Sequence, residues 1–179
     1  MKSDDKKRII KKANEIKSDF KKNNKDTIVG IIENYLPKPK IITSKNDVKG
    51  ANGFYIILSS RKPKASKCTC KVDVKSKTFY AVYRGHSSDM KKRIVSHLFY
   101  DSTCEYPNCM KIMRNSQRYN INIETKSLYN KGVIDANALF PEDEWAIVTV
   151  PLSRSKQFLR EIFEEVFDDK FEKPPYSDK

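Results

Sequence analysis

The chain has 179 residues, which allows one domain, or one domain with a small arm. Hydrophobic residues make up 38%, enough for one modest core, and no run approaches the ~18 apolar residues that a membrane span needs. The chain starts without the apolar segment of a secretory signal, so we expect a cytoplasmic protein. Only five glycines are present, and neither of the glycine-rich phosphate-binding patterns occurs, which argues against a nucleotide-cradling loop.

The charge balance favours a polyanionic partner. Lys and Arg total 36 against 23 Asp and Glu, and the formal net charge is +13. Cationic side chains that neutralise phosphates release condensed counterions, which makes nucleic acid the natural partner. A basic surface that binds nothing is the alternative. An anionic membrane is a weaker third choice, because no basic helix carries an aromatic anchoring face.

Four cysteines leave two interpretations open. Cys68 and Cys70, followed by Cys104 and Cys109, could supply four thiolates to zinc, but the spacing differs from the C-x2-C pair of common zinc modules. In a reducing compartment, incidental loop thiols are the other interpretation, and disulfides are not expected.

Residues 1–45 are predicted to form an N-terminal helical arm. Apolar residues recur at helical spacing in its first half, at Ile9, Ile10, Ala13, Ile16 and Phe20. The pair Asn23 and Asn24 predicts a break, and a second helix is expected to run from there to Pro37. The two helices suit a packing arm, and their lysine face also suits contact with phosphate.

Two apolar and aromatic runs, residues 53–58 and 78–83, predict a β-hairpin. The connection between them, residues 59–77, is long and strongly basic. A helix is expected over residues 89–100, because Met90, Ile94 and Leu98 recur on one side of it.

The rest of the chain contains a long insertion, a third strand and a last helix. In the insertion, residues 101–140, we expect a short helix around residues 124–131. Residues 145–150 predict a strand, and the stripe from Phe158 to Phe171 predicts a helix. This order of elements predicts an α+β domain with a small antiparallel or mixed sheet.

Several polar groups gather around the segment from Tyr83 to His97. A tight turn is expected at Gly85, and Arg93 and His97 are four residues apart on one helical face. Tyr55, on the neighbouring strand, can point into the same place. A guanidinium can hold a phosphate and its developing charge, and a phenol or imidazole can take a proton from attacking water. Singly, each residue has a commoner structural interpretation, and the combination is what favours phosphodiester cleavage.

The motifs Gly53-Phe54-Tyr55 and Tyr83-Arg84-Gly85 resemble the two signature elements of the GIY-YIG nuclease superfamily. Arg93 follows the second tyrosine by ten residues and His97 comes four later, as in family members. The resemblance covers residues 50–177. It implies a nuclease domain with a three-stranded antiparallel sheet flanked by helices. It also assigns the family's two tyrosines, arginine and helical histidine to Tyr55, Tyr83, Arg93 and His97.

The same resemblance implies a glutamate on the last helix that binds one divalent cation, Mg2+ or Mn2+. Glu165, nine residues before Pro174, has the spacing that family members show to the end of the domain. Glu164 competes with it, because the phenylalanines around it match the helical register more closely, and Glu161 is third. Ser177 occupies the position at which family members place an asparagine.

Basic loops beside such a core are where phosphate and base contacts are expected. The predicted DNA-binding residues are Arg61, Lys62, Lys64, Lys67, Lys71, Arg84, Lys91, Lys92, Lys111, Arg114 and Arg118. A compact chain with built-in loops favours a type II restriction endonuclease that cuts double-stranded DNA, most simply as a homodimer on a palindromic site. Two alternatives stay open: a repair or mobile-element nuclease selective for DNA structure, and a non-catalytic nucleic-acid-binding module.

Overall fold

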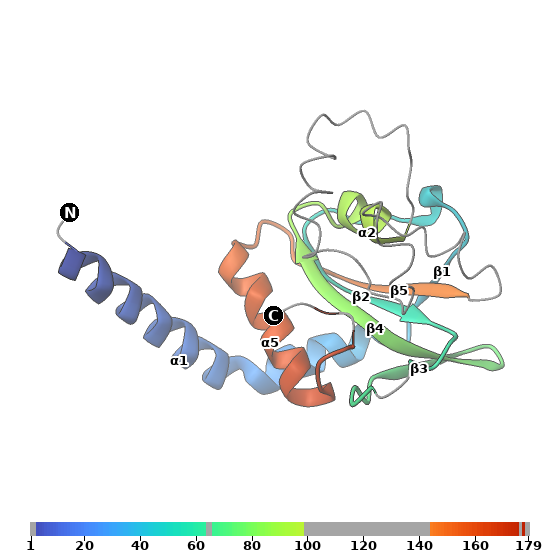
Figure 1. Ribbon diagram of the computed structural model, residues 1–179, viewed down its shortest axis with the longest axis horizontal. Helices are drawn as coiled ribbons and strands as arrows, with labels where there is room; N and C mark the ends of the chain where they lie inside the picture. The colour runs from blue at the N-terminus through green and yellow to red at the C-terminus, as the bar shows by residue number, and fades with distance from the viewer. Residues whose placement is uncertain (1–2, 64–65, 99–143, 176, 178–179) are drawn as a thin grey trace, which may run out of the picture.

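The structure, a computed structural model, describes residues 3–63, 66–98, 144–175 and 177. Its elements are α1 (Ser3–Tyr35), β1 (Lys40–Ile42), the 3-10 helix η1 (Lys45–Asp47), β2 (Gly53–Ser59), β3 (Lys71–Val74), β4 (Lys77–Ser87), α2 (Met90–Leu98), β5 (Trp145–Pro151) and α5 (Gln157–Phe171). The five strands form one antiparallel sheet in the order β1-β5-β2-β4-β3. The fold is therefore α+β, with α2 on one side of the sheet and α1 and α5 on the other (Figure 1).

The three predicted strands correspond to β2, β4 and β5, which are the centre of this sheet, so the expected count of three strands is too low. The additional strands lie at the edges. β1 has three residues and β3 has four, and neither is fully buried along its length. Such short, half-exposed segments carry too little hydrophobic pattern to stand out from a loop in the sequence.

The sheet separates two hydrophobic clusters, because successive side chains of a strand point to opposite faces. On β2, Phe54, Ile56 and Leu58 face α1 and α5. Tyr55 and Ile57 face α2. Central strands buried on both faces read as continuous apolar runs, which is why β2 and β5 were evident in the sequence.

Helix α1 is continuous, and the predicted break at Asn23 and Asn24 is wrong. The Asn24 side-chain amide donates a hydrogen bond to the Phe20 carbonyl oxygen at 2.8 Å, so this residue is accommodated within the helix. Asparagine in a helix costs at most about 0.7 kcal/mol relative to alanine, and the burial of Ile28 and Ile32 in the core outweighs that. The second half of the expected arm therefore belongs to the core, whereas its first half projects from the domain (Figure 1).

Other predicted elements lie partly or wholly outside the described residues. The expected helix over 89–100 is described as α2 up to Leu98, and the insertion 101–140, with its predicted short helix, is outside. Among the helices that the structure describes, none has the sustained apolar character of a membrane span; α1 is long enough but carries charge along most of its length.

Candidate active site

Four of the predicted site residues come together between the sheet and α2. The Tyr55 Oη lies 3.1 Å from the His97 Nε2, and Arg93 hydrogen-bonds to the same phenol. The ring centroid of Tyr83 lies 4.4 Å from that of His97 and 6.1 Å from that of Tyr55. We call Tyr55, Tyr83, Arg93 and His97 the tyrosine cluster.

Gly85 makes room for this cluster. The predicted turn at Gly85 is wrong, because β4 continues as a strand to Ser87. Gly85 pairs with Tyr55 across the sheet. A Cβ at Gly85 would lie 2.7 Å from the Tyr55 Oη and 2.9 Å from the Tyr83 ring. The motif glycine is therefore required by the close approach of two phenols rather than by a reversal of the chain.

Helix α2 presents Arg93 and His97 from consecutive turns. Asp89 caps the helix, since its carboxylate accepts a hydrogen bond of 3.0 Å from the Lys92 backbone N–H. The Met90 side chain anchors the same end against the first residue of β2, where a Cβ on Gly53 would lie 3.0 Å from the Met90 sulfur. Both motif glycines thus allow close packing around the tyrosine cluster.

The cluster is almost closed to water, and this changes its acid–base properties. Tyr55 is 0% exposed, Tyr83 6% and His97 3%. Burial raises the pKa of Tyr55 well above the ordinary phenol value of 10.0, and Tyr83 adds to that rise while Arg93 opposes it. Burial likewise raises the pKa of Tyr83 to about 12. Both phenols therefore carry their protons near neutral pH, and the half-buried Arg93 is the most exposed member of the cluster.

The acidic residues of α5 are not part of this cluster. Glu164 lies on the other face of the sheet, where its carboxylate oxygens are 3.1 Å from the Arg84 Nη1 and 2.9 Å from the His86 Nδ1. Asp168 holds the same arginine at 2.6 Å. The charge of Glu164 nevertheless helps to raise the pKa of Tyr83, after burial as the main cause. Glu164 therefore affects Tyr83 electrostatically although it lies on the other face of the sheet.

Glu165, which the sequence spacing favoured, points away from the tyrosine cluster toward α1. Its carboxylate lies 2.8 Å from the Lys17 Nζ and 3.5 Å from the Lys21 Nζ, and its side chain is 43% exposed. Glu161 shares Lys17 at 3.0 Å. Consecutive residues of a helix point about 100° apart, and for this reason Glu164 and Glu165 have different surroundings.

The second half of β4 forms an edge of the sheet. Strand β3 pairs with β4 only as far as Tyr80. Beyond it, the Arg84 backbone N–H donates a hydrogen bond of 2.9 Å to the Ser177 Oγ. Ser177 therefore ties the segment after α5 to the second motif. The carboxylate of Glu164 lies beside this same part of β4.

The side chains suit a divalent cation only in a limited way. In the described part of the chain, no group of three His, Cys, Asp or Glu side chains is arranged to hold a metal. Mg2+ commonly takes one or two carboxylates together with water and substrate phosphate, and it does not need a closed protein cage. Of the two favoured glutamates, Glu164 lies beside the second motif, where Arg84 and His86 contact its carboxylate, whereas Glu165 lies against α1.

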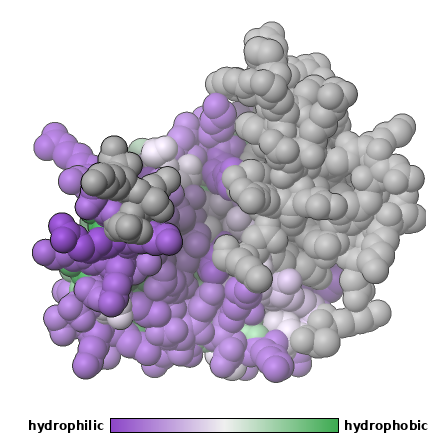
Figure 2. Space-filling view, turned by 60° about the vertical axis from the view of Figure 1, so that its left-hand side comes forward, coloured by the Kyte–Doolittle hydropathy of each residue, from purple (hydrophilic) through white to green (hydrophobic). Residues whose placement is uncertain are grey.

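The predicted DNA-binding residues divide into three groups. Arg61, Lys62, Lys67, Lys71, Lys91 and Lys92 are exposed. Arg84 is buried, with its guanidinium in ion pairs with α5, and so does not reach the surface. Lys64, Lys111, Arg114 and Arg118 lie outside the described residues, as do Cys104 and Cys109. Hydrophilic residues cover most of the described surface on the face shown in Figure 2.

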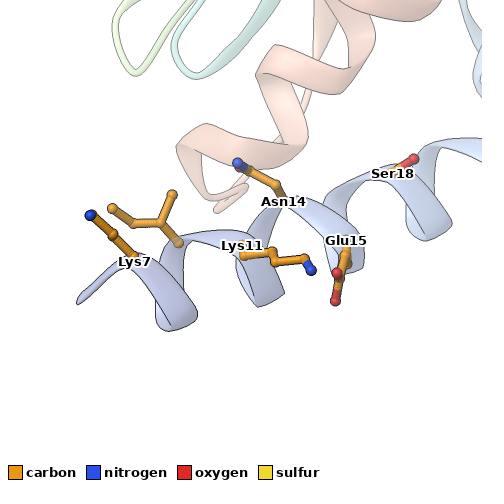
Figure 3. Close-up of a pocket in the computed structure, with 6 residues that line it drawn as sticks. Lys7, Lys11, Asn14, Glu15 and Ser18 are labelled. Atoms are coloured by element: carbon orange, nitrogen blue, oxygen red, sulfur yellow. The ribbon is translucent and has the colours of Figure 1, made fainter. Parts of the chain in front are cut away.

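Cys68 and Cys70 are free thiols, and burial raises the pKa of both, that of Cys70 to about 12. Protonated, buried thiols are poor metal ligands. A shallow hollow of about 570 Å³ runs along α1 and is lined by α1 alone, at Lys7, Ile10, Lys11, Asn14, Glu15 and Ser18 (Figure 3). No predicted site residue lines it.

Two contacts of the site were missed at the sequence level. His86 contacts Glu164, and Asp168 forms an ion pair with Arg84, which also pairs with Glu164. His86 directly follows the second motif, which is a signal that could have drawn attention to it. Asp168 had no such signal, because its role depends on α5 lying across β4.

Comparison with known proteins adds no relative: no family model matches the chain, and no curated protein or solved structure matches it significantly.

Proposed function

We propose that this protein is a GIY-YIG-like, metal-dependent endonuclease that hydrolyses phosphodiester bonds of double-stranded DNA. The observation that carries the proposal is the convergence of Tyr55, Tyr83, Arg93 and His97, with the Tyr55 phenol 3.1 Å from the His97 imidazole. The central strands β5, β2 and β4 have the antiparallel arrangement that this family's fold requires. The net charge of +13 suits a phosphate backbone as substrate.

In this proposal Arg93 binds the scissile phosphate, because it is the accessible cation of the cluster. A guanidinium can hold two phosphate oxygens and stabilises the charge that develops on them. Glu164 is the residue that would hold a divalent cation, Mg2+ or Mn2+, and such an ion would polarise phosphate oxygens and stabilise the leaving group.

Tyr55 and His97 act as a proton relay. A phenol with a raised pKa is a poor base on its own, since its ionised form is disfavoured by burial. If an attacking water enters beside Arg93 and gives a proton to the Tyr55 oxygen while the His97 Nε2 accepts the Tyr55 proton, no phenolate has to form. The water oxygen then bonds to phosphorus, and the bond to the leaving sugar oxygen breaks.

The test is cleavage by the variant Arg93→Ala. Loss of the guanidinium should abolish hydrolysis of plasmid DNA in Mg2+, whereas binding, which depends on many surface cations, should change little. Cleavage at the normal rate by this variant would refute the proposal. Binding is measured by fluorescence anisotropy on the same preparation, so that a misfolded variant is recognised.

The products distinguish restriction from the alternative nucleases. A sequence-specific restriction enzyme, in the simplest case a dimer on a palindromic site, yields discrete plasmid fragments whose ends can be sequenced. A repair or mobile-element nuclease yields smears or prefers branched DNA. Salt-dependent binding with no hydrolysis in any divalent metal would identify a non-catalytic module, an outcome that the near-complete burial of the two tyrosines also suits.

A further inference from the structure

The exposed apolar surface is concentrated along one part of the molecule. Among the described residues, the large hydrophobic side chains with high exposure are Ile9 at 57%, Ile10 at 51%, Ile16 at 60% and Phe158 at 42%. The three isoleucines lie on the half of α1 that projects from the domain (Figure 1). Phe158 of α5 packs edge-on against Phe20 of α1, with ring centroids 6.0 Å apart. The exposed apolar side chains are therefore concentrated on the projecting half of α1 and at the adjoining Phe158.

The spacing of this surface is that of a coiled coil. Ile9, Ala13, Ile16 and Phe20 follow one another at intervals of four, three and four residues, which places them at successive a and d positions of a heptad repeat. We call these four residues the α1 seam. It is about 17 Å long at the helical rise of 1.5 Å per residue. An a/d seam is complementary to another helix with the same spacing.

We propose that the α1 seam is a dimer interface, in which α1 of a second copy packs against it in antiparallel orientation. In this pairing Ile9 meets the partner's Phe20, and Ala13 meets the partner's Ile16. The arrangement is two-fold symmetric, so each contact occurs twice. Because Phe158 adjoins Phe20, the partner's Ile9 covers Phe158 as well.

The charges beside the seam select the antiparallel orientation. Lys12 and Asp19 occupy g positions, are exposed, and form no ion pair with any residue in the described ranges. Antiparallel packing brings Lys12 of each copy to the partner's Asp19. Parallel packing would instead bring Lys12 to the partner's Lys17, a like charge. The charges of Lys12 and Asp19 therefore favour a second copy of α1 as the helix that packs on the α1 seam, and they favour its antiparallel orientation.

Sedimentation equilibrium of the full chain, without DNA or metal, tests the interface independently of any nuclease activity. The wild-type chain should show a reversible monomer–dimer equilibrium. Ile16→Glu should leave it monomeric over the same concentrations, because the new charge lies at the centre of the seam. The matched control is Ser18→Glu, which adds the same charge two residues along α1 and about 200° around the helix from Ile16. A monomeric wild type, or a dimer unaffected by Ile16→Glu, would overturn the proposal.

A charge exchange tests the orientation. Lys12→Glu and Asp19→Lys should each weaken the dimer several-fold, because each places like charges opposite one another across the seam. The double variant should recover the wild-type equilibrium, because the pair is restored in reverse. Lys11→Glu makes the same change of charge away from the seam and should have no comparable effect. Single variants that dimerise as well as the wild type, or a double variant weaker than both, would exclude the antiparallel arrangement.

Discussion

At the scale of single residues, neighbouring carboxylates on α5 have different surroundings although the sequence shows them as equivalents. Glu164 faces Arg84 and His86 on β4, and Glu165 faces Lys17 on α1. The former is 18% exposed and the latter 43%. The position of the helix axis relative to the sheet, rather than the residue type, therefore decides which carboxylate faces β4.

This difference predicts opposite outcomes for two isosteric substitutions. Glu164→Gln should lower the rate of Mg2+-dependent DNA cleavage by at least about 100-fold, the size of effect expected when a metal's immediate surroundings are disrupted. Glu165→Gln should leave cleavage within a few-fold of normal, since it removes only surface ion pairs. Initial rates at saturating metal measure both. If Glu165→Gln lowers the cleavage rate more than Glu164→Gln does, Glu165 rather than Glu164 is the metal ligand.

Gly85 provides a second test at this scale. Gly85→Ala places a Cβ 2.7 Å from the Tyr55 Oη in a fully buried site, and overpacking of that kind lowers the free energy of unfolding by roughly 1–3 kcal/mol. Gly30→Ala is the matched control: a Cβ there has no neighbour within 4 Å and lies in α1, so it should stabilise by roughly 0.5–1 kcal/mol. Urea unfolding measures both; equal effects would show that Gly85 is not sterically required.

At the scale of elements, α1 and α5 are joined by a ladder of ion pairs. Lys17, Lys21 and Lys25 recur every four residues on α1, and Glu161, Glu165 and Asp169 do the same on α5. The residue numbers of the paired side chains increase together along both helices, which means that the two helices run in the same direction. Partial burial alone would raise the pKa of Asp169, but its contacts with Lys21 and Lys25 outweigh burial and lower that pKa below the ordinary value of 3.8.

The ladder should make stability depend on pH and salt. A carboxyl group with a lowered pKa in the folded state contributes stability above its unfolded pKa, and that contribution disappears as the pH falls through the folded value. Lys21→Gln should therefore lower the free energy of unfolding at pH 7 by roughly 0.2–1 kcal/mol for each exposed pair lost, and the loss should shrink in acid and in 1 M salt, where screening is strong.

Lys22→Gln is the control for the ladder, because Lys22 is exposed and forms no ion pair with the described residues. Its substitution should change urea unfolding little at any pH. If Lys21→Gln and Lys22→Gln behave alike at neutral pH and low salt, the ladder contributes nothing measurable.

Considering the whole molecule, four of the exposed cations predicted to bind DNA lie at the two ends of β2. Lys91 and Lys92 are on α2, whose first turn hydrogen-bonds to residues just before β2. Arg61 and Lys62 follow the end of that strand. The strand between them spans roughly 20 Å at 3.3 Å per residue, or about six base pairs at 3.4 Å each. A duplex that contacts both pairs of cations would therefore run along β2.

Salt dependence of DNA binding tests which cations take part. The logarithm of the binding constant should fall linearly with that of salt concentration, and Lys71→Gln or Lys91→Gln should each reduce the slope by about 1 if the lysine contacts one phosphate. Lys17→Gln should leave the slope unchanged, because Lys17 is already paired with Glu161 and Glu165. Anisotropy titrations at several salt concentrations give the slopes; equal reductions by all three would indicate a nonspecific effect of net charge.

The sequence by itself determined the α+β class, the three central strands, α2 and the last helix, because strongly apolar runs and helical periodicity are local signals. The motif spacing also indicated that two tyrosines, an arginine and a histidine would meet. Only the tertiary structure decided that α1 is unbroken, that Arg84 is buried, and that Gly85 serves close packing. It also decided which face of α5 turns toward β4. These depend on contacts between segments far apart in the chain, where burial and ion pairing outweigh the local preferences that a sequence displays.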